Sequence, residues 1–501
     1  VVTRDPSELA ERVWQHIWHA TKDEPKQCLL TFVELFVLKF LSDNLPDKYL
    51  PKKYKFYELL VANDEFQNNH GKPQIQYYIE TIRPKIKSVF SDNTVCDDPT
   101  VGSLFGLGTV VSKTSVINGF SFLESSPVTP SSYNKVFMDI LNEFEKFGSL
   151  TSIDPEFKLR LYETFLKKSA KQSKLGQFFT PRNVVKSIIK MAEVSKLPDG
   201  SVVLDPAAGV GGFILEPSLL ALKNNVTFKA GKPIQKVKFI GVDVDVHTHI
   251  LAKANTLIHY AEAIRDPLVT PDALNKLMAR SFILMNENET LGSLERPPTE
   301  SIDLIMTNPP YVTQGSRIYK ETIAELEGSR NGLDLNDYYD GCGLGLESLF
   351  LRYISGALKA GGQAFVIVPQ GMLTRTESGT KRTILNECNL LASIALPKNT
   401  FFNTPQKTYI LVLEKRHTEA DERPPVFCGI AKSIGETLDY RRHPTPEDNI
   451  LDNIADEFVN WQAGIDPTSI YSRTANAEEF TQFDRWDVLR FWDDSELVEI
   501  G

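Results

Sequence analysis

Thr307-Asn308-Pro309-Pro310-Tyr311 directly follows the apolar run Ile-Asp-Leu-Ile-Met at residues 302–306, and the rest of the chain is arranged around this junction. The apolar run predicts a buried strand. The two prolines then prevent both strand pairing and immediate entry into a helix. We therefore expect a stiff, extended turn that holds the Asn308 amide, the backbone carbonyls and the Tyr311 ring at the carboxyl edge of a sheet, where open α/β folds bind ligands.

A glycine-rich loop lies upstream of this junction. The sequence Val-Val-Leu-Asp-Pro-Ala-Ala-Gly-Val-Gly-Gly-Phe at residues 202–213 predicts a strand, a tight loop and the start of a helix. Glycines let the backbone approach a ligand closely, and a helix N-terminus offers free N–H groups. The loop does not fit a P-loop, because no Gly-Lys-Ser/Thr follows it. Asp205 at the strand end suits a cofactor with a cationic or amine-bearing end, such as the methionine part of S-adenosylmethionine.

The next predicted strand ends in Ile-Gly-Val-Asp-Val-Asp at residues 240–245. An acid at this position usually binds ribose hydroxyls, and Asp243 occupies it, with Asp245 as the second candidate. The alternative is a surface acid at a strand end. The spacing from Asp205 exceeds the roughly twenty residues of the dinucleotide pattern, which a polar loop insertion at residues 223–236 would explain. His247 and His249 have no further ligands at metal-binding spacing, so we predict no metal site.

The sequence Leu-Gly-Gln-Phe-Phe-Thr-Pro-Arg at residues 175–182 precedes a helix with one apolar face. Thr180 is a favourable N-cap residue and Pro181 a favourable first helical residue. Capping explains the Thr-Pro pair but leaves the two preceding phenylalanines unexplained. Aromatic side chains beside a cofactor site can stack on adenine or flank a methionine moiety.

Strands and helices alternate from about residue 170 to 430, which predicts a mostly parallel, doubly wound sheet. The expected strands are residues 202–204, 237–242, 302–306, 364–368, 391–396, 408–413 and 426–430. The run at 408–413 is a candidate for the antiparallel strand that is common at the edge of such sheets. Residues 448–461 predict a helix.

The regions on either side of this sheet have different patterns. Helical periodicity at residues 9–18, 29–41, 132–147 and 157–169 predicts an N-terminal helical domain over 1–165, either for partner or DNA contact or for support of the next domain. The catalytic domain would span 166–462. The tail at 463–501 is amphipathic and aromatic. We expect it to dock on a partner or to lead into a recognition region. The alternative is that it packs back on its own domain.

Composition narrows the class of protein. The 501 residues carry a net charge of -10, which argues against a protein that coats nucleic acid by itself. A basic run at residues 157–196 is the exception, and it predicts either a solvated face or a surface that follows phosphates. The five cysteines are scattered, without a Cys-x-x-Cys pair, which fits a reduced, cytoplasmic setting without zinc or a disulfide framework. No signal peptide or membrane span is expected.

The three motifs together resemble the gamma class of adenine-N6 DNA methyltransferases. They are Gly-Gln-Phe-Phe-Thr-Pro at 176–181, Asp-Pro-Ala-Ala-Gly-x-Gly-Gly-Phe at 205–213 and Asn-Pro-Pro-Tyr at 308–311, in that order. The nearest resemblance is to the methylation subunit of type I restriction-modification systems, over roughly residues 8 to 460. It implies an α/β fold with a Rossmann-like S-adenosylmethionine-dependent methyltransferase sheet and an N-terminal all-helical domain.

The resemblance also implies roles for individual residues. Asn308, Pro309, Pro310 and Tyr311 would be catalytic: the Asn308 side-chain oxygen and the Pro309 carbonyl would accept hydrogens from the target amine, and Tyr311 would stack on the flipped base. The family usually has an acid after the third strand that contacts the cofactor adenine, and Glu289 is the nearest match. The implied cofactor-binding residues are Gly176, Gln177, Phe178, Phe179, Thr180, Pro181, Asp205, Ala207, Gly209, Gly211, Gly212, Phe213, Asp243 and Glu289.

Two other functions are compatible with parts of this pattern. Enzymes that methylate a glutamine amide in protein release factors also use Asn-Pro-Pro-Tyr, but they would not be expected to carry the segment at 176–181 or the long helical module. A catalytically inert methylase fold that serves as an assembly platform is the second alternative, and the intact motif at 308–311 argues against it. No sequence-recognition module is evident after residue 430. The expected partners are therefore double-stranded DNA, a specificity subunit or fused recognition domain, and a restriction subunit.

Overall fold

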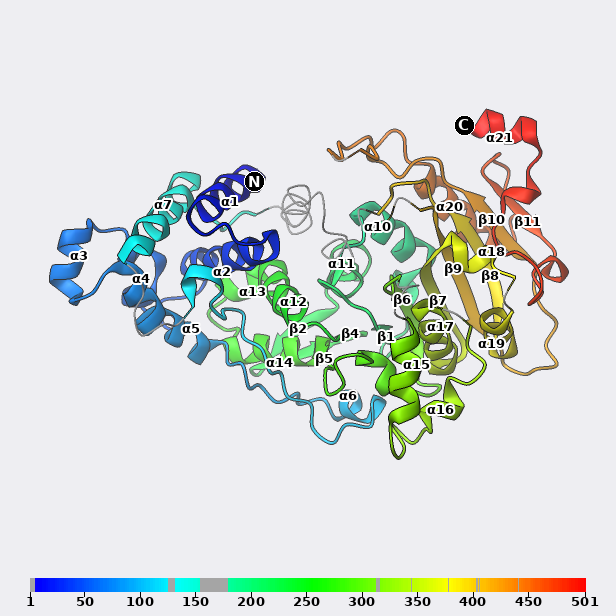
Figure 1. The fold of residues 1–501 in the computed structure, drawn as a ribbon, viewed down its shortest axis with the longest axis horizontal. Helices are drawn as coiled ribbons and strands as arrows, with labels where there is room; N and C mark the ends of the chain where they lie inside the picture. Colours follow the sequence, from blue (N-terminus) through cyan, green and yellow to red (C-terminus); the bar gives the residue numbers. More distant parts are fainter. Residues whose placement is uncertain are drawn as a thin grey trace.

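The computed structural model describes residues 5–124, 131–153, 179–311, 316–343, 345–376, 378–401, 404, 406–439 and 441–501. A group of helices from the N-terminal part of the chain lies at one end, and a wide sheet with helices on both faces lies at the other (Figure 1). The C-terminus is at the end of the molecule far from the N-terminal helices. Within the described ranges, each helix is too short or too polar to cross a lipid bilayer.

The N-terminal region contains the helices that the periodicity predicted. Residues 9–18, 29–41 and 132–147 lie in α1, α2 and α7, whereas the fourth predicted helix, 157–169, lies outside the described residues, as does the predicted boundary at 165. The helices are α1 (Ser7–Thr21), α2 (Pro25–Asn44), α3 (Asn63–His70), α4 (Gln74–Tyr77), α5 (Arg83–Val89), α6 (Pro99–Leu104) and α7 (Ser131–Phe147).

α2 is the centre of this region, because residues 28–42 are buried all the way around the helix. Glu34, in the middle of α2, is 2% exposed and accepts hydrogen bonds from Tyr78 Oη at 2.7 Å, Arg83 Nε at 2.8 Å and the Gly119 amide at 3.0 Å. A buried charge is tolerated only when it is paired and hydrogen-bonded. The Glu34 cluster therefore joins three separate segments of the region.

Within the described ranges, nine strands form the main sheet, in the order β11-β10-β8-β9-β7-β6-β1-β4-β5. All are parallel except β9, which is antiparallel to β7 and β8, and β11, which is antiparallel to β10. The strands are β1 (Val202–Asp205), β4 (Lys238–Asp243), β5 (Phe282–Leu284), β6 (Ile302–Thr307), β7 (Leu358–Pro369), β8 (Cys388–Ala395), β9 (Thr408–Lys415), β10 (Val426–Ile430) and β11 (Ser472–Ala475).

Helices cover both faces of the sheet, so its inner strands are apolar on both sides. One face packs against α10, α11 and α20, and the other against α15, α16, α17, α19 and the C-terminal tail. The helices after the N-terminal region are α10 (Arg182–Met191), α11 (Gly212–Leu220), α12 (Val246–His259), α13 (Ala261–Arg265), α14 (Pro271–Ser281), α15 (Ser316–Glu325), α16 (Leu335–Tyr338), α17 (Leu346–Ala357), α18 (Gln370–Thr374), α19 (Gly379–Glu387), α20 (Ile450–Gln462) and α21 (Asp494–Ile500).

The structure has every predicted strand and corrects three details. β9 is antiparallel, as predicted, but it lies between β7 and β8 and not at an edge. The predicted loop insertion at 223–236 contains a hairpin, β2 (Val226–Lys229) and β3 (Lys232–Gln235), whose turn has Ala230 and Gly231 at positive φ. Its polar composition concealed the alternation that a strand needs. β5 and β11 are too short for their patterns to be recognised.

The tail packs back on its own domain, which is one of the interpretations of its aromatic residues. β11 extends the sheet beyond β10, and the side chains of Trp486 and Trp492 are buried. The Trp486 carbonyl accepts a hydrogen bond from Ser393 Oγ at 2.7 Å, which fixes the tail to β8. Docking of a partner on the remaining surface of the tail stays a prediction.

The N-terminal region also packs directly on the sheet region. Residues 94–112, which include α6, pack against the sheet region, where Asp97 pairs with Arg280 at 2.6 Å and Asp98 with Lys238 at 2.8 Å. Val101 and Phe105 from this segment are buried in the apolar cluster beneath the sheet. Support of the sheet is therefore one role of this region, and contact with a partner or DNA stays a prediction.

Candidate active site

The site is built where β6 and β1 end side by side. Thr307, the last residue of β6, is fully buried, and its Oγ1 donates to Asp205 Oδ1 at 2.6 Å. The same carboxylate oxygen accepts from the Ala207 amide at 3.0 Å. The end of the strand before Asn308 is thereby hydrogen-bonded to the start of the glycine-rich loop, as expected for neighbouring parallel strands.

The Asn308 amide is held at both ends. Its Nδ2 donates to Thr180 Oγ1 at 3.3 Å, and its Oδ1 accepts from the Tyr311 hydroxyl. Thr180 does not act as an N-cap, because Pro181 occupies the cap position of α10. Two of the sequence motifs therefore meet at Asn308, whose amide is bonded at both ends.

The Tyr311 ring is held by an aromatic and an acidic neighbour. It packs edge-on against Phe401, with the ring centroids 6.4 Å apart. Burial, together with the nearby Glu347 carboxylate, raises the pKa of Tyr311 well above its ordinary value, so the hydroxyl keeps its proton. Glu347 is 1% exposed and pairs with Arg375 Nη1 at 3.1 Å. Sequence analysis missed Glu347, which lies inside an ordinary amphipathic helix pattern.

Asp243 connects the glycine-rich loop to the end of β4. Its Oδ2 accepts from the Gly209 amide at 3.0 Å, and its Oδ1 accepts from the Asp245 amide at 2.9 Å. Burial raises the pKa of Asp243 to about 6 and that of Asp205 to about 7, although their hydrogen bonds act in the opposite direction. Among the described residues no cation is paired with either acid, so only these hydrogen bonds oppose the effect of burial on their pKa.

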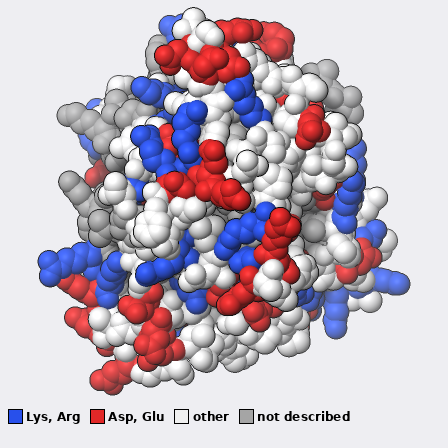
Figure 2. Space-filling model, turned by 90° about the vertical axis from the view of Figure 1, so that its right-hand side faces the viewer, with Lys and Arg blue, Asp and Glu red and all other residues white. Residues whose placement is uncertain are grey.

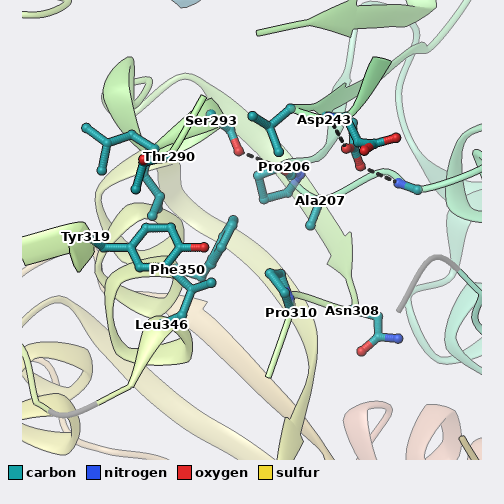
Figure 3. Close-up of a pocket in the computed structure, with 16 residues that line it drawn as sticks. Pro206, Ala207, Asp243, Thr290, Ser293, Asn308, Pro310, Tyr319, Leu346 and Phe350 are labelled. Carbon is teal, nitrogen blue, oxygen red and sulfur yellow. Dashed lines mark hydrogen bonds between the residues drawn. The ribbon is translucent and has the colours of Figure 1, made fainter. Parts of the chain in front are cut away.

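A pocket opens between the ends of these strands (Figure 3). One side has Pro206, Ala207 and Gly209 of the loop and Asp243, Val244 and Asp245 after β4. The opposite side has Tyr319 of α15 and Leu346 and Phe350 of α17. Residues 290–294 close it from a third side, and Asn308 and Pro310 stand at its edge.

The loop at residues 290–294 is shaped by local interactions. Asn288 Oδ1 accepts from the amides of Thr290 and Leu291, each at 3.0 Å, and so begins the turn. Gly292 has φ +54°, and a Cβ there would lie 2.8 Å from the Cβ of Val244. A side chain at Gly292 would therefore push the loop away from β4 and open the pocket.

The structure brings some of the predicted site residues into this pocket and leaves others outside. Ala207, Gly209, Asp243, Asn308 and Pro310 line it. Asp205, Thr180 and Tyr311 do not line it but hydrogen-bond the residues that do or their neighbours. Gly176, Gln177 and Phe178 lie outside the described residues.

The remaining predicted residues have other surroundings. Gly211, at φ +91°, precedes α11, and a Cβ there would lie 2.6 Å from the Phe282 ring. Phe213 is buried in the apolar cluster of α10 and α11, and Phe179 in the cluster that joins the helical region to α12. Gly212 begins α11, Pro181 precedes α10, and Pro309 is buried. Glu289 is exposed and is not part of the pocket lining, whereas its neighbours Thr290 and Leu291 are.

Sequence reasoning missed the wall formed by Tyr319, Leu346 and Phe350. These residues come from helices whose apolar spacing signals only core packing. The one available signal was the position of Tyr319, a few residues after the Asn-Pro-Pro-Tyr motif.

In the described part of the basic run at residues 157–196, three basic side chains form ion pairs. Arg182 pairs with Glu216, Lys190 with Asp452 and Asp456, and Lys196 with Glu193. Figure 2 shows the side of the molecule that carries the C-terminal part of the chain, and on it Lys and Arg side chains are interspersed with Asp and Glu. Most of the run lies outside the described residues, so a surface that follows phosphates stays a prediction.

Comparison with known proteins agrees with the motifs. A family model described as N-6 DNA Methylase matches residues 159–487. The StySPI type I methylase subunit of Salmonella potsdam is 28% identical over 264 residues, which cover 51% of this chain and 44% of that protein. The EcoEI type I methylase subunit of Escherichia coli is 28% identical over 358 residues, which cover 68% and 64%. The aligned part thus spans about half to two thirds of the length of these relatives.

Solved structures show the same fold. A modification subunit of a type I restriction enzyme from Vibrio vulnificus superimposes with a TM-score of 0.55 and 16% identity, covering 98% of this chain and 99% of that one. A chain from a study of type I R-M complex assembly gives a TM-score of 0.55 and 19% identity, covering 98% and 93%. The sheet is therefore the Rossmann-like methyltransferase sheet that the motifs implied.

Proposed function

The chain belongs to the N-6 DNA methylase family, and on this premise we propose that it methylates the N6 amine of adenine in DNA, as the modification component of a restriction-modification system. The observation that carries the proposal is the position of Asn308. Its amide stands at the edge of a pocket formed by the glycine-rich loop, and Thr180 and Tyr311 fix its orientation.

The residues of the pocket fit S-adenosylmethionine, the cofactor of this family. The pocket has an acidic end at Asp243 and an apolar, aromatic end at Tyr319, Leu346 and Phe350, which suits a ribose next to a purine. Among the described residues, the lining includes two acids and no Lys or Arg, which favours a cationic ligand. Asp243, Ala207 and Gly209 would hold the cofactor, which supplies an electrophilic methyl group on a sulfonium.

Asn308 and Pro309 would activate the target amine. The lone pair of an adenine amine is delocalised into the ring, so the amine is a poor nucleophile. Two acceptors aimed at its hydrogens would localise that lone pair toward the methyl donor. The Asn308 oxygen accepts one hydrogen bond from Tyr311, and a carbonyl oxygen has two lone pairs, so one is left for the substrate.

Tyr311 would form one wall of the target-base site. A base cannot reach the pocket while it is stacked in a duplex, so it must flip out. Phe401 holds the Tyr311 ring edge-on, which keeps the face of the ring in a fixed direction for stacking. Alignment of the amine with the methyl group, and not a covalent enzyme intermediate, would provide most of the acceleration.

Recognition of a DNA sequence would come from a partner. The net charge of -10 and the mixture of both signs on the face in Figure 2 do not favour tight DNA binding by this chain alone. The relatives StySPI and EcoEI are named as methylase subunits of type I restriction enzymes. We expect a specificity subunit or a fused recognition domain, and a restriction subunit, to act with this chain.

A filter assay with methyl-labelled cofactor tests the proposed substrate. The chain would be incubated with DNA, and separately with a protein release factor, with and without the products of neighbouring genes. Label on DNA, recovered as N6-methyladenine after digestion, supports the proposal. Label on the release factor alone would assign the chain to glutamine methylation, and no transfer to either, with all partners present, would support an inert assembly platform.

A further inference from the structure

The two ends of the pocket differ in the polar groups that they offer. At the Asp243 end, each carboxylate oxygen accepts one backbone hydrogen bond and keeps a lone pair for a sugar hydroxyl. At the opposite end, apolar side chains dominate, and the polar groups are the side-chain hydroxyls of Tyr319 and Thr290. The Ser293 hydroxyl is already used, because it donates to the Pro206 carbonyl at 2.6 Å. A purine at this end therefore has few partners for its hydrogen-bonding edge.

In the family that this chain resembles, an acid usually contacts the adenine of the cofactor, and Glu289 is the nearest match in this sequence. In the structure, Glu289 is exposed and does not line the pocket. Tyr319 does line it, and Figure 3 shows its hydroxyl directed toward the other lining residues. Among the residues that the structure describes, none forms a hydrogen bond with this hydroxyl.

Tyr319 is held firmly in this position by its own helix. Ile323, one turn further along α15, is 3% exposed and packs in the cluster beneath the sheet. The neighbouring Lys320 donates from Nζ to the carbonyls of Cys342 at 3.0 Å and Gly343 at 2.9 Å. These contacts anchor α15 against the segment that precedes α17, so the ring of Tyr319 is already in place before a ligand enters.

Burial raises the pKa of the Tyr319 hydroxyl above its ordinary value. The group therefore stays protonated at neutral pH and can both donate and accept a hydrogen bond. A carboxylate can only accept. Tyr319 is thus able to bind a purine edge at either an amino hydrogen or a ring nitrogen.

We propose that Tyr319 recognises the purine of the cofactor, with its ring against the base and its hydroxyl hydrogen-bonded to the base edge, in the role that sequence resemblance gave to Glu289. This inference rests on the proposed function, because it takes the ligand of the pocket to be S-adenosylmethionine. It assigns the recognition of the purine to the helix that follows the catalytic motif.

Calorimetric titration of the full 501-residue chain tests this assignment. The probes are S-adenosylmethionine and 5′-methylthioadenosine, which keeps the purine and ribose but lacks the amino acid. Tyr319→Phe should weaken both probes about three- to tenfold, the range for one hydrogen bond, and Tyr319→Ala about tenfold or more. Glu289→Ala and Arg317→Ala, an exposed change on the same helix, should leave both affinities within about twofold.

The outcomes separate the inference from the proposed function. If the unaltered chain binds neither probe, the cofactor assignment itself fails. If it binds both, and Tyr319→Phe and Tyr319→Ala bind as tightly, the role of Tyr319 is refuted. A loss confined to Glu289→Ala or to Thr290→Val would transfer the role to that residue. Tyr319→Phe preserves the packing of the ring, so the test does not depend on the stability of the alanine variant.

Discussion

Acids in the two halves of the molecule have opposite surroundings. In the helical region, Glu34 meets a guanidinium, a phenol and a backbone amide, which together compensate its charge. At the carboxyl edge of the sheet, the described residues that donate hydrogen bonds to Asp205 and Asp243 are all neutral, and burial raises the pKa of each acid. The first arrangement stabilises a fold, whereas the second leaves charge and hydrogen-bonding capacity for a ligand.

Removing the compensated acid should have the largest effect on stability. Glu34→Ala leaves the Arg83 guanidinium, 5% exposed, without its partner. Loss of one member of a buried ion pair costs about 3–5 kcal/mol. Denaturant unfolding followed by circular dichroism should show that loss, whereas Glu65→Ala on the exposed face of α3 should change little. A cost below about 1 kcal/mol would mean that the cluster does not hold the helical region together.

Asp243, which has no cationic partner among the described residues, should instead control the affinity for the cofactor. The charged form of Asp243 is the better acceptor for ribose hydroxyls, and its pKa is about 6. Because the charged fraction falls as the pH drops below the pKa, affinity for S-adenosylmethionine should fall about tenfold between pH 7 and pH 5. Asp243→Asn should bind more weakly at pH 7 and lose this pH dependence, whereas the exposed Asp64→Asn keeps both. Unchanged calorimetric affinity in Asp243→Asn or Asp243→Ala would assign the ribose to another residue.

The smallest expected effect concerns the hydrogen bond between the two strand ends. Thr307→Val removes the donor to Asp205 and should cost about 1 kcal/mol, the usual value for one hydrogen bond. Thr307→Ser keeps the hydroxyl and should behave like the unaltered chain. Thermal unfolding of both variants measures the difference. Equal losses in Thr307→Ser and Thr307→Val would show that the hydroxyl contributes no more to stability than the buried methyl group that Thr307→Ser removes.

The fold could be predicted from the sequence because the motifs lie at the ends of strands. The apolar runs before Asp205, Asp243 and Asn308 are strands, and parallel strands bring their carboxyl ends together. The meeting of Asn308 with Thr180 followed from the resemblance of the three motifs to one family. The pattern of each segment also identified the long helices α1, α2 and α7.

Side-chain surroundings were much less accessible to sequence reasoning. Phe179 and Phe213 pack in apolar clusters with neighbouring helices, and their contact with the cofactor stays a prediction. Tyr319 and Phe350 line the pocket although their helices have only ordinary amphipathic patterns. The pairing of Glu34 with Arg83 joins residues far apart in the chain, which one sequence without relatives does not reveal.

The most direct test of the central claim separates cofactor binding from methyl transfer at Asn308. Asn308→Ala is compared with the exposed Asn68→Ala, in the presence of the partners needed for activity, by calorimetry with S-adenosylmethionine and by labelled-methyl transfer to DNA. We predict that Asn308→Ala binds the cofactor normally and transfers no methyl group. Transfer retained within about tenfold of the unaltered chain, or about 1.4 kcal/mol of barrier, would contradict the role of Asn308 and with it the assignment of the site.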